Sequence, residues 1–319
     1  MFNSKEDEEK FTKIFFPHFW ERYSDVKHNN TCFVHYTTAQ AAISILKNKE
    51  FWMRDSKCMN DVSEVNHGMN CLSNAYKGTQ GGSGLKNALI SLGIAKEVEE
   101  KFDNHQDDFT LNTYLTCFSE HNVKENDLGR LSMWRAYGSN SGVAVVIKNH
   151  AFFLESELQI VASPVEYLNE ADFIDKLNIV VDNITSNKAF IEGFDKEYII
   201  NTVFTALKFS VLCTKHPAFL EEREWRLICS PTMDDVSAHS HKDVETINGI
   251  PQVVYKIPLK NKPEIGLVGV EIPELIERII IGPTAYPMPI WDAFVELLGN
   301  AGVEKPWEKV IVSHIPLRN

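Results

Sequence analysis

The sequence has few of the features by which common protein classes are identified. Its longest apolar stretches, such as Gly142–Ile147, are far shorter than the roughly 20 residues of a membrane span. The 6 cysteines are scattered and form no C-x-x-C pair, and there is no Walker loop, G-x-G-x-x-G, G-x-S-x-G or H-E-x-x-H motif. Membrane-spanning proteins, disulfide-stapled domains and the commonest motif-bearing enzyme classes are therefore disfavoured.

Basic residues are also scarce, with 32 Lys and Arg against 44 Asp and Glu and a formal net charge of −12 over 319 residues. Binding to nucleic acid depends on a basic surface that releases counterions, so we expect no strong non-specific nucleic-acid binding. With 44% hydrophobic residues the composition is that of a soluble globular protein. The charged residues 5–10 indicate no secretory signal, and isolated cysteines suit a reducing compartment, so we expect a cytoplasmic protein without a membrane partner.

Hydrophobic periodicity predicts an α+β fold. Runs rich in β-branched and aromatic residues indicate strands, which fall at 32–37, 51–54, 113–119, 142–148, 161–167, 222–229, 253–257, 277–281 and 309–315. Apolar residues at helical spacing indicate helices, which fall at 6–23 with an interruption near Pro17, and at 39–47, 61–76, 85–104, 131–137, 170–213 and 290–298. We expect a mixed, mostly antiparallel twisted sheet of about seven to nine strands with inserted and flanking helices.

The same pattern predicts the domain organisation. Residues 1–30 form an N-terminal helical segment. Residues 31–319 form a single α+β domain with helical insertions near 61–105 and 170–213, the second of which holds two or three helices.

The segment Glu222-Arg223-Glu224-Trp225-Arg226 is the clearest candidate for chemistry. A strand alternates its side chains, so Glu222, Glu224 and Arg226 are expected on one face, with Arg223 and Trp225 on the other. If that face lines a cleft, one carboxylate could orient or deprotonate a hydroxyl while Arg226 holds the other carboxylate or a phosphate. A solvated edge strand or a structural ladder of ion pairs is the alternative.

A second candidate is the run His35-Tyr36-Thr37, where a predicted strand leads into a helix. His35 and Thr37 share a face, and Thr37 or Thr38 can cap the helix, whose free N–H groups favour an anion. The alternative is a hydrogen-bonded core histidine.

Four weaker candidates remain. In Met133–Gly138, Arg135 and Tyr137 could bind a ring or base, although aromatic residues in a core are commoner. Asn60 or Asp61 can cap a helix together with Glu64, and Lys215 could add positive charge to a cleft. His239-Ser-His241 lacks further ligand spacing, so no metal site is expected.

The order of these motifs is similar to that of an uncharacterised bacterial family, domain of unknown function twenty-nine seventy-one. The resemblance runs from about residue 32 to the C-terminus and depends on these motifs together: His35-Tyr36-Thr37, Asn60-Asp61 with Glu64, Cys117-Phe118-Ser119, Met133-Trp134 with Tyr137, Gly142-Val143, Lys215, Glu222-x-Glu224-x-Arg226, and Ile279–Pro283.

More distantly, the chain resembles ADP-ribosyltransferases, which hold NAD in a split sheet. His35, Ser119 and Glu224 stand in the order of that family's early, middle and late strand residues. The resemblance implies that His35 bonds the adenosine ribose, that Tyr36 or Tyr137 stacks on nicotinamide, and that Glu224 bonds a ribose hydroxyl and stabilises an oxocarbenium-like transition state. It also implies that Glu222 faces the acceptor.

The predicted site therefore has two parts. Glu224 and Glu222 are the predicted catalytic residues, and those expected to bind NAD are His35, Tyr36, Thr37, Ser119, Arg135, Tyr137 and Arg226.

Two functions from different classes fit these residues. The first is an intracellular NAD-consuming transferase or glycohydrolase, a toxin or phage-defence effector whose acceptor is an unidentified small molecule, protein or nucleic acid. The second is a non-catalytic regulatory module that binds a nucleotide-like ligand, or whose polar cluster only braces the sheet. The enzyme requires His35 and Glu224 to face each other across one cleft.

Overall fold

The computed structural model describes residues 2, 4–58, 62–77, 82–231, 241–247 and 249–316 and divides the chain into two compact units. The helical unit comprises Met1–Ser24, Asp55–Thr113 and Ser163–Leu220, and the strand unit comprises Asp25–Arg54, Tyr114–Ala162 and Glu221–Asn319. Both predicted helical insertions join the N-terminal segment in the first unit. Segments distant in sequence therefore pack together within each unit.

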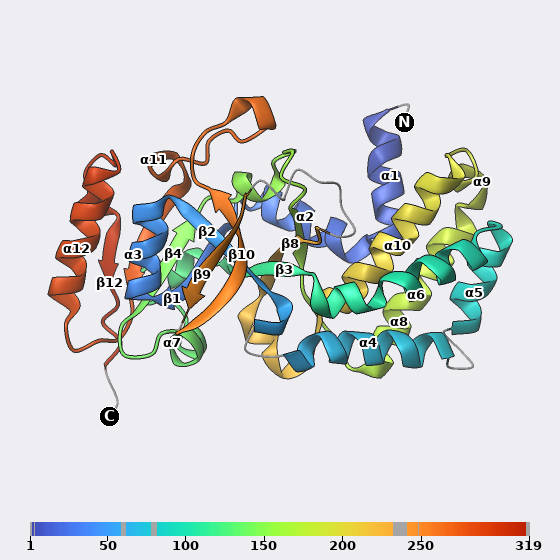
Figure 1. Cartoon of the computed structure of the whole chain (residues 1–319), viewed down its shortest axis with the longest axis horizontal. Coiled ribbons are helices and arrows are strands. Elements are labelled where there is room, and N and C mark those ends of the chain that lie inside the picture. Colours follow the sequence, from blue (N-terminus) through green and yellow to red (C-terminus); the bar gives the residue numbers. More distant parts are fainter. Residues whose placement is uncertain are drawn as a thin grey trace. The chain divides into compact units, whose positions relative to one another are not determined.

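The helical unit is built around α10 (Lys196–Leu212), which packs against α4 (Val62–Lys77) and α6 (Ala95–Leu111) (Figure 1). Its other elements are α1 (Lys5–Phe15), the first part of α2 (Pro17–His28), η1 (Ser56–Cys58), α5 (Gly82–Ser91), β6 (Glu166–Tyr167), α8 (Glu170–Ser186), α9 (Lys188–Ile191), β7 (Thr214–Lys215) and most of η4 (Pro217–Glu222).

Local sequence signals set the ends of these helices. Side chains of Ser4, Asn169 and Asp195 accept hydrogen bonds from the first turns of α1, α8 and α10, which satisfies donors that a helix start leaves open. The interruption predicted near Pro17 is confirmed, because α1 ends at Phe15 and Pro17 begins α2.

The strand unit contains the main sheet and confirms the α+β fold class. Its path runs β12-β11-β4-β1-β3-β2-β10-β9, and β8 pairs with β3 and β5. The strands are β1 (Cys32–Thr38), β2 (Glu50–Asp55), β3 (Tyr114–His121), β4 (Gly142–Ile147), β5 (Val161–Pro164), β8 (Glu224–Cys229), β9 (Lys242–Ile247), β10 (Ile250–Pro258), β11 (Ile276–Ile281) and β12 (Val310–Val312). β1 pairs with β3 and β4, β10 with β2 and β9, β4 with β11, and β3 with β8, all antiparallel, whereas β11 and β12 pair in parallel.

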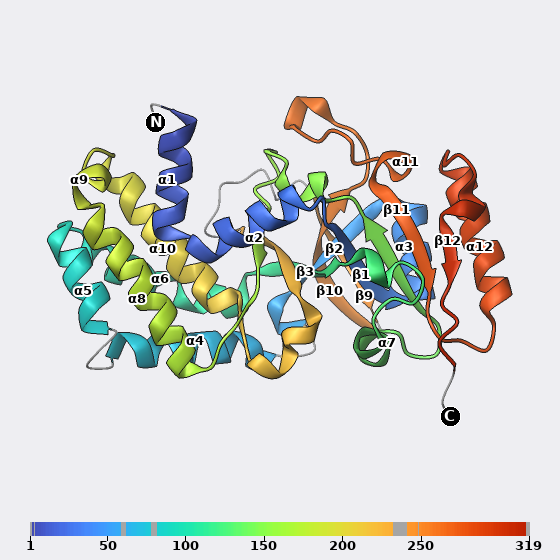
Figure 2. The ribbon, with the colours of Figure 1, turned by 180° about the vertical axis from the view of Figure 1, so that it is seen from behind.

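Short helices pack against this sheet. Figure 2 shows α12 (Pro287–Asn300) alongside β12, and both α12 and α3 (Ala39–Asn48) contact strands of the sheet. The remaining helices of the unit are α7 (Leu131–Tyr137), α11 (Ile272–Leu275), η2 (Val123–Glu125), η3 (Asn149–Phe153), η6 (Pro263–Ile265) and η7 (Pro306–Glu308).

The sheet is split beside β3. Three strands pair with β3, but a strand has only two edges. Ser119 pairs with Val34 of β1 and with Glu224 of β8, so β1 and β8 lie on opposite edges. Because β8 occupies its edge from Tyr114 to Ser119, β2 must share the edge of β1, and the two strands diverge along it.

Apolar side chains pack against both faces of this part of the sheet. One face carries Val34, Tyr36, Ala144 and Ile280, which pack against Met133 and Trp134 of α7. On the other face the fully buried Trp225 ring contacts Phe33, which in turn stacks on Phe152. Both faces are therefore largely closed by apolar packing around β1 and β3.

Within the described residues, no helix combines the length and apolarity that crossing a membrane would require.

Candidate functional site

The polar side chains of β8 form a buried ion pair. Glu224 and Arg226 share a face, as predicted, and Arg226 Nε donates to Glu224 Oε1 at 2.7 Å. The two side chains are 5% and 3% exposed, so water screens the pair little. Ser119 and Cys117 lie directly opposite them on β3.

Glu222 does not continue this face, which corrects the sequence prediction. β8 begins only at Glu224, and Glu222 ends the 3-10 turn η4. Between them Arg223 adopts a left-handed backbone with φ 44°, which interrupts the alternation of a strand. Arg223 likewise leaves the Trp225 face and pairs with Glu125.

His35 and Glu224 lie on opposite faces of the sheet. Val34, Ser119 and Glu224 are paired in one row across β1, β3 and β8. Residues paired in this way project to the same face, whereas the next residue along a strand projects to the other. The expected cleft joining His35 to Glu224 is therefore wrong, because the register places His35 on the face opposite Glu224.

His35 is half-buried and lies against apolar neighbours. Its Nδ1 is 2.9 Å from the carbonyl oxygen of Cys117, and the ring packs against Phe51 and Phe118. Burial lowers the pKa of His35, so the ring is neutral and donates this hydrogen bond. The histidine thus binds the backbone of β3 close to where β1 and β2 diverge.

Tyr36 is part of the core rather than an open stacking platform. Its ring packs edge-on against Trp134, and its hydroxyl accepts a hydrogen bond of 2.9 Å from the backbone N–H of Arg130. Burial raises the Tyr36 pKa to about 12. Thr37 pairs with Val143 within the sheet, and it is Thr38 that caps α3 through a 3.2 Å hydrogen bond.

Two other predicted residues lie nearer to solvent. Tyr137 is half-buried at the end of α7, and its hydroxyl donates to Glu222 Oε1 at 3.1 Å. Arg135 is exposed on the same helix. Glu222 is itself half-buried, so a carboxylate and a phenol meet where solvent can reach them.

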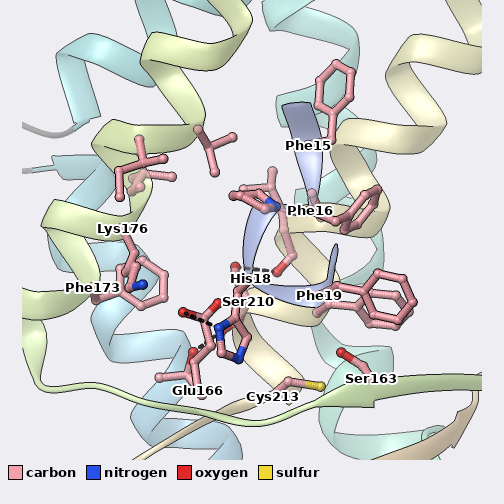
Figure 3. A pocket seen from close by; sticks show the side chains of 18 of the residues that line it. Phe15, Phe16, His18, Phe19, Ser163, Glu166, Phe173, Lys176, Ser210 and Cys213 are labelled. Carbon is pink, nitrogen blue, oxygen red and sulfur yellow. Dashed lines mark hydrogen bonds and ion pairs between the residues drawn. The ribbon is translucent and has the colours of Figure 1, made fainter. Parts of the chain in front are cut away.

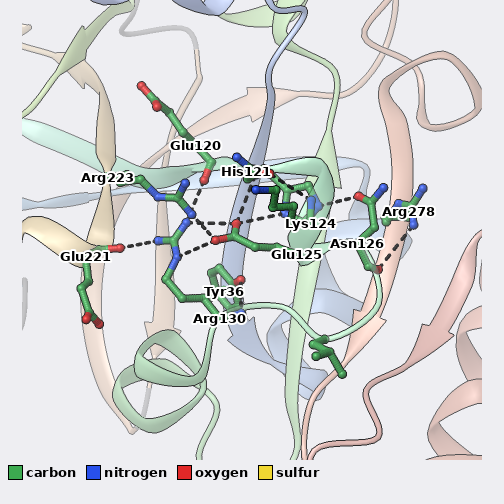
Figure 4. A network of polar contacts seen from close by, with 12 residues as sticks. Tyr36, Glu120, His121, Lys124, Glu125, Asn126, Arg130, Glu221, Arg223 and Arg278 are labelled. Carbon is green, nitrogen blue, oxygen red and sulfur yellow. Dashed lines mark hydrogen bonds and ion pairs between the residues drawn. The ribbon is translucent and has the colours of Figure 1, made fainter.

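A polar network surrounds Arg130, a residue to which no sequence motif pointed (Figure 4). The guanidinium donates to the backbone carbonyls of Glu120 and Glu221 at 2.9 and 2.5 Å and pairs with Glu125 at 3.1 Å. Arg223 binds the same Glu125 carboxylate. The network therefore ties β3, η2 and the approach to β8 together.

A local signal for part of this network is present in the sequence. Asn122 and Glu125 have the spacing of a capping box, and both reciprocal hydrogen bonds are formed around η2. That motif could have located the turn that presents Glu125. Its contacts with Arg130 and Arg223, which are 5 and 98 residues distant, depend on tertiary structure.

Within the helical unit, two of the family-motif residues meet. Lys215 Nζ lies 2.7 Å from Glu64 Oε1, and the Lys215 side chain is 4% exposed. Lys215 is thus held by a carboxylate inside this unit. Asn60 and Asp61, the predicted caps before Glu64, lie outside the described residues, as does His239.

Among the residues that the structure describes, no group of three or more His, Cys, Asp or Glu is placed to hold a metal ion.

Comparison with known families gives one match. Residues 133–227, from α7 to β8, match the model of a family described as "Protein of unknown function (DUF2971)". This confirms the resemblance predicted from the motifs, over a shorter part of the chain. The matched residues include Tyr137, Lys215, Glu222, Glu224 and Arg226, whereas His35 and Ser119 lie outside them. No curated protein and no solved structure is similar to the chain.

Proposed function

We propose that this chain is a regulatory module that binds a nucleoside-like ligand at Glu222 and Tyr137, without consuming NAD. The observation that carries the proposal is the pair itself: a half-buried carboxylate 3.1 Å from a half-buried phenol hydroxyl. Carboxylates accept hydrogen bonds from the two adjacent hydroxyls of a ribose, and a phenol adds a donor or an aromatic edge.

The position of His35 supports binding rather than catalysis. An NAD-cleaving site needs the groups that hold the dinucleotide and the acid that stabilises the transition state to act on one surface. His35 instead donates to the Cys117 carbonyl from the face opposite Glu224. Glu224, in turn, is committed to the buried pair with Arg226.

One feature favours the enzyme as a second candidate. The sheet is split beside β3, between β1 and β2, as the ADP-ribosyltransferase resemblance implies. The proposed function is therefore tested against NAD turnover in the same experiment.

Binding is measured by isothermal titration calorimetry with adenosine and with 2′,3′-dideoxyadenosine, which lacks both ribose hydroxyls of interest. We expect adenosine to bind at least tenfold more tightly, because the two hydroxyl hydrogen bonds to an ionised acceptor are lost in the analogue. Glu222→Gln should lose this preference. Glu221→Gln, an exposed neighbour with the same charge change, should keep it.

Equal affinity for the two nucleosides, or an unchanged preference in Glu222→Gln, would contradict the binding site. Release of nicotinamide from NAD by the parent protein, measured chromatographically, would instead establish the enzyme. Glu224→Gln is less suitable as the test variant, because removing one member of a buried ion pair strands the other charge and threatens the fold.

A further inference from the structure

The helical unit contains a cavity of about 300 Å³ that the sequence motifs do not include (Figure 3). It lies between the junction of α1 and α2, helices α8 and α10, and β6. Most of its wall is apolar, with Phe16, Phe19 and Phe173 among the lining residues. A cavity of half this volume binds benzene, so the space suits a molecule of about two rings.

Two ionisable side chains meet in the wall of this cavity. Figure 3 shows His18 of α2 beside Glu166 of β6, and the shortest distance between them, from Nδ1 to Oε2, is 3.9 Å. That distance is too long for a hydrogen bond. Within the described residues, neither His18 Nε2 nor Glu166 Oε2 has a hydrogen-bond partner, although both atoms are buried. Buried polar atoms without partners are uncommon and costly, so this pair points to a ligand.

The chemistry of His18 Nε2 and Glu166 Oε2 determines which ligand groups could form hydrogen bonds with them. The His18 ring is hydrogen-bonded to the backbone of Val165, and because Nε2 has no partner, Nδ1 is the nitrogen that makes this bond. Burial lowers the His18 pKa to about 4, so the ring is neutral and its Nε2 is an acceptor. Glu166 Oε2 is an acceptor whenever the carboxylate is ionised. Both open positions therefore call for a ligand that donates hydrogen bonds.

The charged side chains in the cavity wall favour a neutral ligand. Charges of both signs line the wall, since Lys176 of α8 is basic and Glu21 and Glu166 are acidic. A cationic head group would meet the Lys176 ammonium, and an anionic one would meet the Glu166 carboxylate. A primary amide is neutral, carries two N–H donors, and has a carbonyl oxygen that can accept from Lys176.

We propose that this cavity binds a neutral aromatic amide of about two rings, whose N–H groups donate to Glu166 and His18 while its rings lie among Phe16, Phe19 and Phe173. This site is independent of the one proposed for the strand unit, and its test uses different ligands and variants.

The experiment compares 2-naphthamide with methyl 2-naphthoate, which has the same rings and carbonyl but no N–H group. Calorimetry on the full chain at pH 7.5 should give at least tenfold tighter binding of the amide, since a hydrogen bond to a charged group is worth about that factor. Glu166→Leu should reduce the preference to less than threefold. Glu192→Gln, an exposed change on the same unit, should leave it intact.

Filling the cavity provides the second test. Ser210 lines it from α10, and Ser210→Phe should abolish binding of both compounds while the melting temperature is retained. Ala206 lies one turn away on the same helix and also lines the cavity, so Ala206→Phe replaces that variant if it does not fold. Equal affinity of amide and ester, a preference that survives Glu166→Leu, or binding that survives a folded filling variant would each overturn the proposal.

Discussion

Two residues of the helical unit, His18 and Glu166, have pKa values that burial moves in opposite directions. Desolvation lowers the pKa of His18 to about 4, and the positive charges of Lys176 and Arg22 act in the same direction. Desolvation raises the pKa of Glu166 to about 7, which Glu21 reinforces and Lys176 opposes. In the folded protein His18 is therefore neutral above about pH 4, and Glu166 is mostly ionised only above about pH 7.

The two shifts have opposite effects on stability. For His18 the unfolded chain binds the proton more readily, so its contribution is complete above its ordinary pKa of 6.5 and is lost as the pH falls towards 4. For Glu166 the folded protein holds the proton, so its contribution is complete below 4.5 and is lost as the pH rises towards 7. Between pH 4.5 and 6.5 the two effects oppose each other.

Replacing either residue should leave only the other residue's effect on the pH dependence of stability. Relative to the parent, Glu166→Gln should gain about 2–3 kcal/mol of unfolding free energy between pH 4.5 and 6.5, since each pKa unit corresponds to about 1.4 kcal/mol. His18→Gln should lose a similar amount over the same interval. Urea unfolding at several pH values measures the free energy of unfolding of each variant. A pH dependence parallel to that of the parent would contradict these pKa shifts.

At the scale of elements, the crossing of α4 and α10 depends on one glycine. A Cβ atom at Gly68 would lie 2.1 Å from the backbone oxygen of Val211, so the helices could not remain at their present separation. Gly84 of α5 is different, because its added Cβ would lie 3.5 Å from the Val181 side chain, an ordinary contact.

These two glycines therefore predict opposite outcomes for the same substitution. Gly68→Ala should cost about 2–3 kcal/mol through overpacking. Gly84→Ala should be neutral or gain about 0.5–1 kcal/mol from the higher helix propensity of alanine. Thermal unfolding compares the two variants with the parent. A Gly68→Ala protein as stable as the Gly84→Ala protein would show that the crossing tolerates a wider separation.

The network around Arg130 acts at the same scale. Its five-donor guanidinium reaches the three backbone carbonyls of Glu120, Glu221 and Glu222 and the Glu125 carboxylate, which come from β3, the approach to β8, and η2. A lysine could not make these contacts in one plane. The strand unit thus uses an arginine to fix the segment that carries Glu222, and the proposed binding residue depends on that bracing.

At the scale of the whole molecule, the net charge of −12 sets the expected behaviour towards polyanions. A 30-base-pair duplex should not be retarded in a gel-shift assay at micromolar protein and about 150 mM salt, because few counterions would be released on binding. Micromolar binding that weakens steeply as salt is added would contradict this expectation and would indicate a local basic surface.

Short-range sequence patterns were sufficient to predict several features of the structure. Alternation along a strand predicted that Glu224 and Arg226 share a face, and proline geometry predicted the break between α1 and α2. The run from 170 to 213 was predicted to hold two or three helices and holds α8, α9 and α10. These features depend on residues only a few positions apart, so they can be read from the chain directly.

Other features depended on contacts between distant segments. The register of β1 on β3 decides that His35 faces away from Glu224, and a one-residue shift would have reversed that result. The left-handed backbone at Arg223 removes Glu222 from the strand face, and no sequence rule requires it there. The His18–Glu166 cavity likewise needs elements drawn from α2 and β6, some 150 residues apart in sequence.

The sequence by itself thus determined the α+β class, most element positions and the polar pair of β8, because periodicity and backbone stereochemistry act over short spans. Only the tertiary structure decided which candidate residues share a surface, since sheet register, the Arg130 network and the packing of the helical unit join residues far apart along the chain.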